Sequence, residues 1–486
     1  MAKNPAGIAS WDPFRSSLAY WNWFSHTSDI WWTRQQGQAA ISAAIVARFD
    51  ALVRFARRRS PFYRTTYRSL PAERFSLADL PPLSKSQLMA NFDEWVTDPA
   101  VSRSGVEGFV GDPALVGEKY LGRYAVWKSS GSTGEPGIFM HDADALATYD
   151  ALIAAPLATT ELAANYTWGL LAEGGRAALI AATGAHFASI ASWQRLVHSS
   201  PWQDSRVFSV MTPLARLMSE LNTYQPAFLA SYPTVLALLA EEQDSGRLCI
   251  HPKTLWSGGE CLTPAMQKET ERAFGCAVIN EYGASECLSI AFGCRHGWLH
   301  INADWVILEP VDAEYRPVPA GEISTTTLLT NLANYVQPII RYDLGDSIML
   351  RPDRCPCGSP LPAICVEGRA DDVLALRAEN AAIIRVPPMA VTTVVEEATG
   401  VHRFQIEQTG PDRLALRLGT SSATDADTAW RSAYTALHGY LVHQGLANVR
   451  ISRDRRAPRP DPLSGKLRQV VKTGSRQASP PHSCRE

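Results

Sequence analysis

The chain has 486 residues, of which 46% are hydrophobic and 19% are charged, and its 46 basic and 48 acidic residues give a net charge of −2. That length exceeds what one compact core takes up, so we expect two or more domains. The near-zero charge and the lack of an apolar run long enough for a membrane span argue against nucleic acid and a membrane as partners.

The N-terminal 40 residues are rich in tryptophan, with Trp21, Trp23, Trp31 and Trp32 among them. We expect either a pair of surface helices or packing on a second subunit, which would make the protein a homodimer. The first 14 residues contain one lysine and no apolar core, so they do not predict a signal peptide. Nine scattered cysteines suit a reducing compartment, and we expect a cytoplasmic protein. Apolar residues at helical spacing predict a helix over 41–59.

A run of glycines and hydroxyl residues at 127–137 lies between two apolar segments, which predicts a strand, a loop and a second strand. Glycines let backbone N–H groups converge, and hydroxyls add donors, so the loop suits a phosphate chain. A solvated linker is the alternative. The Gly-Lys-Ser/Thr ending of a Walker loop is absent. The acidic segment that begins at His141 resembles a metal site, but we expect an ordinary loop there.

Residues 107–330 alternate strand-like and helix-like segments, which predicts an α/β fold. The expected strands are 177–182, 227–230, 254–256 and 277–280, and the expected helices are 233–242 and 264–274. Two of the strands are followed by polar turns that contain glycine, SGGE at 257–260 and EYGASE at 281–286. Open α/β sheets bind ligands at such strand ends.

From residue 305 the pattern changes to strands with short turns, which predicts a β-rich subdomain. A smaller α+β unit follows, and the polar C-terminal end reads as disordered. We therefore expect three parts: residues 1–367 as a large domain, 368–470 as a small domain, and 471–486 as a disordered tail.

Six motifs in one order carry a resemblance: SSGSTGEPG, SGGE, EYGASE, NLANYVQPIIRYDLGD, GRADD and PLSGK. The chain resembles the adenylate-forming superfamily of acyl-CoA synthetases, adenylation domains and luciferases, and within it the phenylacetate–CoA ligase-like branch. The resemblance covers about residues 45–470. It implies a large AMP-binding domain, a small mobile domain, and a reaction in two halves. A carboxylic acid, here a small aryl acid, reacts with ATP and Mg²⁺ to give an acyl-adenylate, and CoA then takes the acyl group.

The resemblance also implies roles for single residues. The loop that would wrap the ATP phosphates contains Ser129, Ser130, Gly131, Ser132, Thr133 and Gly134. The implied nucleotide-binding residues elsewhere are Gly258, Gly259, Glu260, Tyr282, Gly283, Ser285, Asp346 and Arg369. Glu286 would hold Mg²⁺, for which a carboxylate is a suitable hard ligand. Taken alone, Tyr282 or Asp346 would more simply be a packing or turn residue.

Three further residues correspond to mobile or catalytic positions of the family. Lys466 matches the catalytic lysine, whose cation would neutralise charge that develops at the α-phosphate. Asp371 matches the hinge about which the small domain turns. His186 lies where relatives carry a histidine near the carboxylate pocket, and a core histidine is the competing interpretation.

A second constellation is formed by Cys294, His300, Cys355 and Cys357. Three cysteines and one histidine make a recognised structural zinc site. Some members of the branch carry such a site with the histidine six residues after the first cysteine, which favours His300 over His296. Unrelated reduced thiols are the alternative.

Two departures from the family pattern bear on the second half-reaction. Glu135 stands where the phosphate loop often has lysine, and Ala378 stands where a glycine lets the pantetheine arm of CoA pass. An amine, a carrier-protein thiol or another small molecule is therefore an alternative acceptor. A zinc-containing binding protein without catalysis is the third hypothesis, and the presence of Lys466 and Glu286 argues against it.

Overall fold

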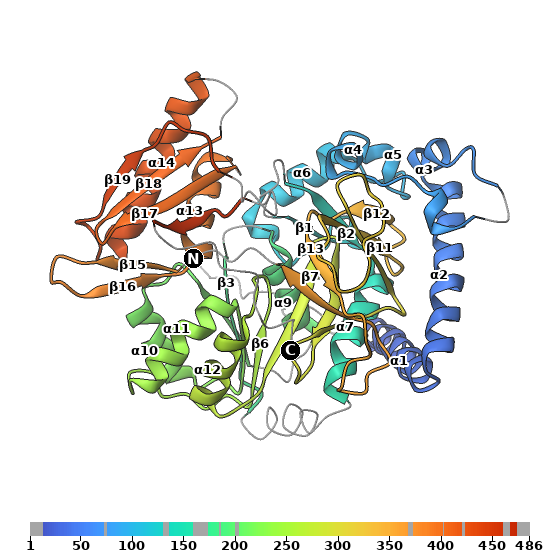
Figure 1. The fold of residues 1–486 in the computed structure, drawn as a ribbon, viewed down its shortest axis with the longest axis horizontal. Coiled ribbons are helices and arrows are strands. Elements are labelled where there is room, and N and C mark those ends of the chain that lie inside the picture. Colours follow the sequence, from blue (N-terminus) through green and yellow to red (C-terminus); the bar gives the residue numbers. More distant parts are fainter. Residues whose placement is uncertain are drawn as a thin grey trace, which may run out of the picture.

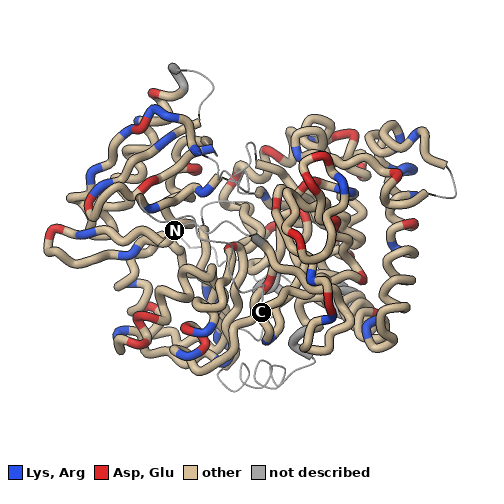
Figure 2. Tube along the Cα trace, viewed as in Figure 1, with Lys and Arg blue, Asp and Glu red and all other residues tan. Residues whose placement is uncertain are grey.

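The computed structural model describes residues 13–71, 75–129, 136–158, 174–183, 186–199, 204–367, 373–401, 403–419, 423–459 and 467–473. Figure 1 shows a mixed central sheet, with the N-terminal helices along one side and a smaller unit of helices and strands at the other end. Among the described residues, no helix has the length and apolar character needed to cross a bilayer. Lys and Arg are interspersed with Asp and Glu along the chain (Figure 2), consistent with its near-zero net charge.

The N-terminal part is helical: α1 (Pro13–Gln35), α2 (Gln38–Arg59), α3 (Pro61–Thr66), α4 (Lys85–Ala90), α5 (Phe92–Trp95) and α6 (Arg103–Gly111), with 3₁₀ turns at Leu77–Asp79 and Pro113–Leu115. The predicted helix over 41–59 is confirmed, and its buried face includes Leu52 and Val53. Ser60 ends it and caps α3, because its side chain accepts a hydrogen bond from the Tyr63 N–H. Helix α1 leaves Trp21 and Trp32 63% and 59% exposed.

The central sheet has nine strands in the order β13-β14-β9-β8-β7-β6-β5-β3-β4. Strands β4, β3, β5, β6 and β7 are parallel, and β7, β8, β9, β14 and β13 are antiparallel. Their bounds are β3 (Ala177–Ala181), β4 (Ser205–Ser209), β5 (Phe228–Ser231), β6 (Thr254–Ser257), β7 (Val278–Ala284), β8 (Cys287–Gly293), β9 (Leu299–Ile301), β13 (Ser347–Leu350) and β14 (Ala363–Glu367). The sheet therefore changes from parallel to antiparallel at β7.

Helix α7 (Ala143–Ala158) precedes β3, and the crossover helices of the parallel half are α9 (Ala188–Ser199), α10 (Leu214–Tyr224), α11 (Pro233–Asp244) and α12 (Pro264–Phe274). The predictions for α11 and α12 are confirmed. Helix α12 begins where the Thr263 side chain accepts from the Met266 N–H, and it ends at Gly275, whose φ of 66° suits glycine. The alternation of buried strands and helices thus gives the α/β class that the sequence predicts.

Some boundaries differ from the sequence predictions. Strand β7 continues through Ala284, so residues 281–284 belong to the strand and do not follow it, because they pair with β8. The β-rich region divides between two sheets: β10 (Val306–Val311), β11 (Thr326–Asn331) and β12 (Ile339–Asp343) form one, whereas β13 and β14 extend the central sheet. His141 is not in a loop, since it pairs with Ala125 at the end of β2.

Strands β1 (Ala125–Lys128) and β2 (Ile138–His141) form an antiparallel hairpin and enclose the predicted phosphate loop. Beyond the central sheet lie a hairpin of β15 (Leu374–Arg377) and β16 (Ile383–Val386), a sheet in the order β19-β18-β17-β20, and helices α13 (Pro388–Thr399) and α14 (Ala423–His443). That sheet consists of β17 (Phe404–Gly410), β18 (Arg413–Leu418), β19 (Arg450–Arg453) and β20 (Val470–Lys472). Val471 and Lys472 were expected in a disordered tail, but they pair with β17.

Candidate active site

The EYGASE motif forms the tightest turn of the site, at the strand where the sheet changes direction. Ala284 of β7 pairs with Cys287 of β8, so Ser285 and Glu286 form the two-residue connection between them. Gly283 lies so close to β8 that a Cβ atom there would be 1.9 Å from the carbonyl oxygen of Leu288. Only glycine fits this approach, which explains its place in the motif.

Two tyrosine–carboxylate contacts connect this turn with the segment after β12. The Tyr282 hydroxyl donates to Asp346 Oδ2 at 2.8 Å, and the Tyr342 hydroxyl donates to Glu286 Oε1 at 2.6 Å. Glu286 is 6% exposed. Burial raises its pKa, and the Tyr342 hydrogen bond acts in the opposite direction. The structure thus brings together four residues from two segments, of which Tyr282 and Asp346 are 64 positions apart in the sequence.

The SGGE segment is held to the start of α11. Glu260 Oε2 accepts from the Thr234 hydroxyl at 2.7 Å and from its backbone N–H at 3.2 Å, in the first turn of that helix. A carboxylate is favourable at this end of a helix because the unpaired N–H groups carry positive partial charge. Gly259 has a φ of 81° and lies against the Tyr232 ring, so it needs the left-handed region that glycine readily adopts.

The base of the predicted phosphate loop is closed by its own backbone and tied to the EYGASE turn. Ser129 N–H donates to the Gly137 carbonyl at 2.9 Å, and its hydroxyl accepts from the Gly137 N–H at 2.8 Å. The carbonyl of Ser285 accepts from Trp127 Nε1 at 2.8 Å and from His141 Nε2 at 3.1 Å. Because Trp127 is on β1 and His141 on β2, both strands of the loop contact one turn.

The His141 ring is fixed in one neutral tautomer. Its Nε2 donates to Ser285, so its Nδ1 is the acceptor for the Asn334 side chain at 3.3 Å. Burial lowers the pKa of His141 to about 3, which keeps the ring neutral at physiological pH. Trp127 stacks on it with ring centroids 4.2 Å apart. His141 therefore holds the hairpin in place and does not act as a metal ligand.

Several predicted site residues lie outside the described residues. In the phosphate loop they are Ser130, Gly131, Ser132, Thr133 and Gly134, and Glu135 lies outside as well. The others are Arg369, Asp371 and Lys466. Their roles stay predictions from the motifs.

His186 occupies a core position next to the loop. Its Nε2 lies 2.9 Å from the carbonyl oxygen of Asp112, its ring packs against Phe109, and its own carbonyl accepts from the Lys128 N–H at 2.7 Å. Its Nδ1 is buried without a hydrogen-bond partner in the described part of the chain. The adjacent Phe187 lines the cavity described next, and His186 is not among the described lining residues.

One cavity of about 1360 Å³ joins these segments. It lies at the carboxyl ends of the parallel strands and against β7, where an α/β sheet binds ligands. The predicted nucleotide-site residues that line it are Ser129, Gly258, Gly259, Glu260, Tyr282, Gly283, Ser285, Glu286 and Asp346, and the predicted metal ligands Cys294, His300 and Cys357 line it as well. The chain thus brings four separated motifs to one cavity large enough for a nucleotide and a second substrate.

Three amide side chains that the sequence analysis did not single out hold the motifs in register. The Asn331 side chain donates to the Glu286 carbonyl at 2.9 Å, and the Asn334 side chain donates to the Met140 carbonyl at 2.8 Å. Gln337 bonds both the Met140 N–H at 2.7 Å and the Ile138 carbonyl at 3.1 Å. All three are fully buried and belong to the NLANYVQP motif. Three amide residues within seven positions were the sequence feature that could have indicated this role.

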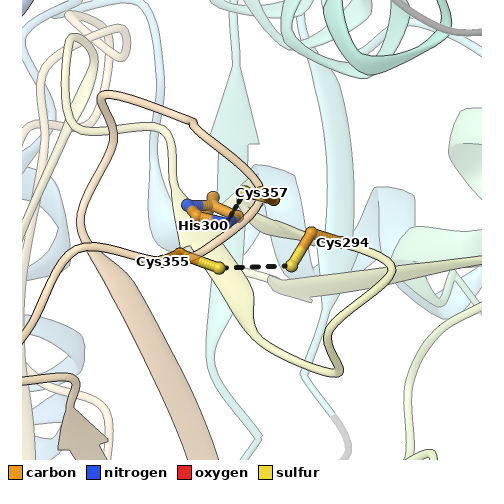
Figure 3. Close-up of side chains that lie close together, drawn as sticks. All are labelled: Cys294, His300, Cys355 and Cys357. Carbon is orange, nitrogen blue, oxygen red and sulfur yellow. Dashed lines mark hydrogen bonds between the residues drawn. The ribbon is translucent and has the colours of Figure 1, made fainter.

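The four predicted zinc ligands come together at the end of the β8–β9 hairpin and in the segment between β13 and β14. Figure 3 shows Cys294, His300, Cys355 and Cys357 pointing toward one another. Their ligand atoms all lie within 4.8 Å of one another. The preference for His300 agrees with this geometry, since His296 contacts Arg295 at the surface.

The distance between two of the sulfurs suits a tetrahedral metal site. Cys294 Sγ and Cys355 Sγ are 3.7 Å apart, and a Zn–S bond of about 2.3 Å places two sulfurs about 3.8 Å apart in a tetrahedron. Cys357 Sγ lies 3.1 Å from His300 Nε2. His300 Nδ1 donates to the Leu361 carbonyl at 3.0 Å, which leaves the Nε2 lone pair directed at the thiols.

Comparisons with known proteins agree with this description. Residues 126–323 match the model of the AMP-binding enzyme family. Among curated relatives, protein CapK of Staphylococcus aureus is 30% identical over 138 residues, and the phenylacetate–coenzyme A ligase of Thermus thermophilus is 26% identical over 315 residues. These matches cover 27% and 61% of this chain and only 28% and 65% of the relatives' own lengths.

The fold is also that of solved ligase structures. A 2-hydroxyisobutyryl-CoA ligase in complex with 2-HIB-AMP and CoA is 23% identical, with a TM-score of 0.54 over 88% of this chain and 89% of that one. An open conformation of the same ligase is 22% identical, with a TM-score of 0.50 over 89% and 92% of the two chains.

Proposed function

We propose that this chain, a member of the adenylate-forming superfamily, is an AMP-forming ligase that activates a small carboxylic acid with ATP and transfers the acyl group to CoA. The observation that carries this proposal is the single cavity that SGGE, EYGASE, Asp346 and the base of the phosphate loop line together. Each of these motifs alone has a structural explanation. Their convergence at the strand where the sheet changes direction supports a shared ligand.

In the first half-reaction a carboxylate oxygen attacks the α-phosphorus of ATP, and the bond to the β-phosphate oxygen breaks as pyrophosphate leaves. Ser129 lies at the base of the loop that would bind the departing phosphates. Tyr282 donates to Oδ2 of Asp346, which helps to orient the carboxylate that would accept from the ribose hydroxyls. Lys466 would neutralise charge that develops at the α-phosphate.

Glu286 is the residue that would hold Mg²⁺. Tyr342 fixes one carboxylate oxygen, and the side chain lines the cavity beside Ser285. A hard oxygen ligand of this kind suits the ion, which would neutralise the phosphate charge. In the second half-reaction the CoA thiolate attacks the acyl carbon, and AMP leaves.

The structure bears on whether Ala378, which stands where relatives have glycine, would obstruct the pantetheine arm of CoA. The Ala378 side chain is 7% exposed and belongs to the apolar core beside the β15–β16 hairpin, and its N–H donates to the Ala382 carbonyl at 2.8 Å. Its methyl group is therefore packed inward. We propose that residues 368–470 form the domain that moves between the two half-reactions, with its hinge at Asp371.

Two further proposals concern the whole protein. We propose that Cys294, His300, Cys355 and Cys357 hold a structural zinc ion, because their spacing fits a closed tetrahedral site. We also propose a homodimer, because one face of α1 exposes Trp21, Phe24, Trp31 and Trp32. Sedimentation of the wild type and of a Trp21→Arg/Trp32→Arg variant tests the dimer, and a wild type that sediments as a monomer overturns it.

The activity is tested by pyrophosphate release with ATP, Mg²⁺ and a panel of aryl and aliphatic acids, with and without CoA. We expect Lys466→Ala and Glu286→Gln to lower release by roughly 100-fold or more, since each removes charge stabilisation in the transition state. Lys268→Ala is the matched control, because Lys268 is exposed on α12. If none of the acids in the panel supports pyrophosphate release, the proposal is overturned. Release without a thioester product keeps the adenylation step and replaces CoA by another acceptor.

A further inference from the structure

One face of the parallel half-sheet forms a wall of the cavity. Paired residues on neighbouring strands share a face: Ala177 with Phe228, Ala230 with Trp256, and Trp256 with Ile279. Alternation along β7 then places Glu281 on the same face as Ile279. The residues of this face that line the cavity are Ala177, Leu179, Ala181, Phe228, Ala230, Trp256, Ile279 and Glu281.

This part of the cavity is apolar and aromatic. Trp193 of α9 stacks on Phe228 with ring centroids 6.2 Å apart, and Phe228 packs at 6.3 Å against Trp256. Small side chains on β3 and β5 leave room in front of the rings. Such a chamber, adjoining the proposed nucleotide site, suits a flat hydrophobic body.

Glu281 is an acidic group in this apolar chamber. Its Oε2 accepts from Trp256 Nε1 at 3.0 Å, and its Oε1 is buried without a hydrogen-bond partner among the described residues. Burial raises the pKa of Glu281 to about 7, against the smaller effects of Ser289 and Trp256. A buried acceptor left without a donor destabilises a fold, and a ligand that donates a hydrogen bond to it would remove that cost.

Another acidic side chain lines the cavity, but it already forms an ion pair. Arg195 and Asp150 also line the cavity, but they form a bidentate pair with distances of 2.9 and 2.6 Å. The two charges neutralise each other, so the pair does not require a charge from a ligand, although Arg195 Nε is buried without a hydrogen-bond partner among the described residues. Glu281 differs because the side chains that act on it, Trp256 and Ser289, are neutral, and its Oε1 has no hydrogen-bond partner among the described residues.

We propose that Glu281 is a specificity-determining residue that recognises an acid whose hydrophobic, ring-sized body carries a second group able to donate a hydrogen bond, an amino or a hydroxyl group. This inference rests on the proposed function, since the carboxylate of the same molecule would react with ATP. The aromatic wall would contact the body of the acid, and its donor would meet Glu281 Oε1. The acid class is thus narrowed from small aryl acids in general to those with an amino or hydroxyl substituent.

The test compares benzoate and phenylacetate with their hydroxy and amino derivatives at each ring position, using pyrophosphate release to obtain kcat/KM. We expect the wild type to prefer at least one donor-bearing acid over its unsubstituted parent by about 100-fold or more, because a site built around a hydrogen bond strongly rejects the analogue that lacks the donor. Glu281→Met should reverse the preference. Glu281→Gln should lower kcat/KM less for the hydroxy-substituted acids than for the amino-substituted ones, since glutamine keeps a hydrogen-bond acceptor and loses the charge.

The outcomes separate this inference from the proposed function. Glu269→Gln is the control, since Glu269 is exposed on α12 and should keep the wild-type preference. The inference is wrong, and the ligase activity stands, if the wild type activates unsubstituted and substituted acids with equal kcat/KM. The same conclusion follows if Glu281→Met keeps the wild-type preference and a thermal melt shows that the variant is folded. If no acid releases pyrophosphate, the proposed function fails and this inference fails with it.

Discussion

At the scale of single residues, buried amides decide where the phosphate-loop strands lie. Gln337 presents its side-chain amide to β2 as a neighbouring strand would, with one acceptor and one donor for the backbone of Ile138 and Met140. Asn331 does the same for the EYGASE turn through the Glu286 carbonyl. The Gln337 contacts cross almost 200 positions of sequence and the Asn331 contact crosses 45, so they join motifs that local sequence does not bring together.

Replacement of Gln337 by leucine should lower activity more than stability alone explains. The change leaves a buried N–H and a buried carbonyl unpaired, at roughly 1–3 kcal/mol each, and releases the exit strand of the loop. Gln243→Leu is a matched control, because Gln243 makes the same pair of bonds to the Ile250 backbone away from the cavity. Thermal melts should show a smaller loss for Gln243→Leu, because its bonds are only partly buried, and kcat for pyrophosphate release by the folded protein should fall only for Gln337→Leu. Equal kcat for the two would contradict a positioning role.

The protonation of Glu281 should make the free energy of unfolding depend on pH. Its folded pKa of about 7 lies above the unfolded value of about 4.3, so the folded state holds its proton more tightly. The stability from this proton is fully present below pH of about 4 and is lost as pH rises through 7. We expect Glu281→Gln to lose less stability than the wild type between pH 5 and pH 8, by roughly 1–3 kcal/mol. Urea unfolding at both pH values measures this, and parallel losses would contradict it.

At the scale of elements, the cysteine and histidine cluster joins two hairpins of the antiparallel half-sheet. Cys294 directly follows β8 and His300 belongs to β9, whereas Cys355 and Cys357 lie between β13 and β14. The strands themselves meet only where β9 pairs with β14, through two residue pairs. A metal ion at this place would therefore strengthen the weakest junction of this half-sheet.

Removal of zinc should lower the thermal stability of the protein, because the proposed role of the ion is structural and not catalytic. We expect elemental analysis to find zinc in the purified protein and a strong chelator to lower the melting temperature by roughly 5 °C or more, because ion binding contributes to folding free energy. Cys357→Ser should behave in the same way without chelator. Cys249→Ser is the control, since Cys249 is exposed and lies outside the cluster. A zinc-free protein with an unchanged melting temperature would exclude the structural site.

At the scale of the whole molecule, the small unit is placed against the α10–α11 side of the central sheet (Figure 1). Gln444 after α14 donates to the Met211 carbonyl at 2.8 Å, and Arg385 of β16 pairs with Glu241 of α11. The hydrophobic core beneath is continuous between the two parts. A unit that turns between half-reactions must break the polar contacts, and both partners of the ion pair are about half exposed.

Reversal of one charge in this pair should alter the balance of the two half-reactions. An exposed pair contributes only about 0.2–1 kcal/mol, so Glu241→Arg or Arg385→Glu should change the ratio of pyrophosphate release to thioester formation by no more than about fivefold. The double swap Glu241→Arg/Arg385→Glu should restore the wild-type ratio. Single-turnover kinetics measure both steps, and a double variant that behaves as the sum of the singles would contradict coupling through this contact.

The sequence by itself determined the features that depend on neighbouring residues. Helix α12 follows from its Thr263 cap and Gly275 end, and the β1–β2 hairpin follows from apolar runs on each side of a glycine-rich loop. The order of the motifs gave the resemblance to the adenylate-forming superfamily, and that resemblance favoured His300, which the structure brings to the cluster. The helix and the hairpin depend on local patterns, so periodicity, capping and turn chemistry are sufficient to read them.

Only the tertiary structure decided the contacts between distant segments. The alternation of β7 does not reveal that its polar end pairs with β8 or that Glu281 faces an aromatic chamber, because strand pairing is a property of the sheet. Likewise, nothing local in Val470–Lys472 marks a strand, which forms because β17 leaves an edge for it. Side-chain amides such as Gln337 acquire their role when the fold buries them opposite unpaired backbone groups, and that depends on the whole chain.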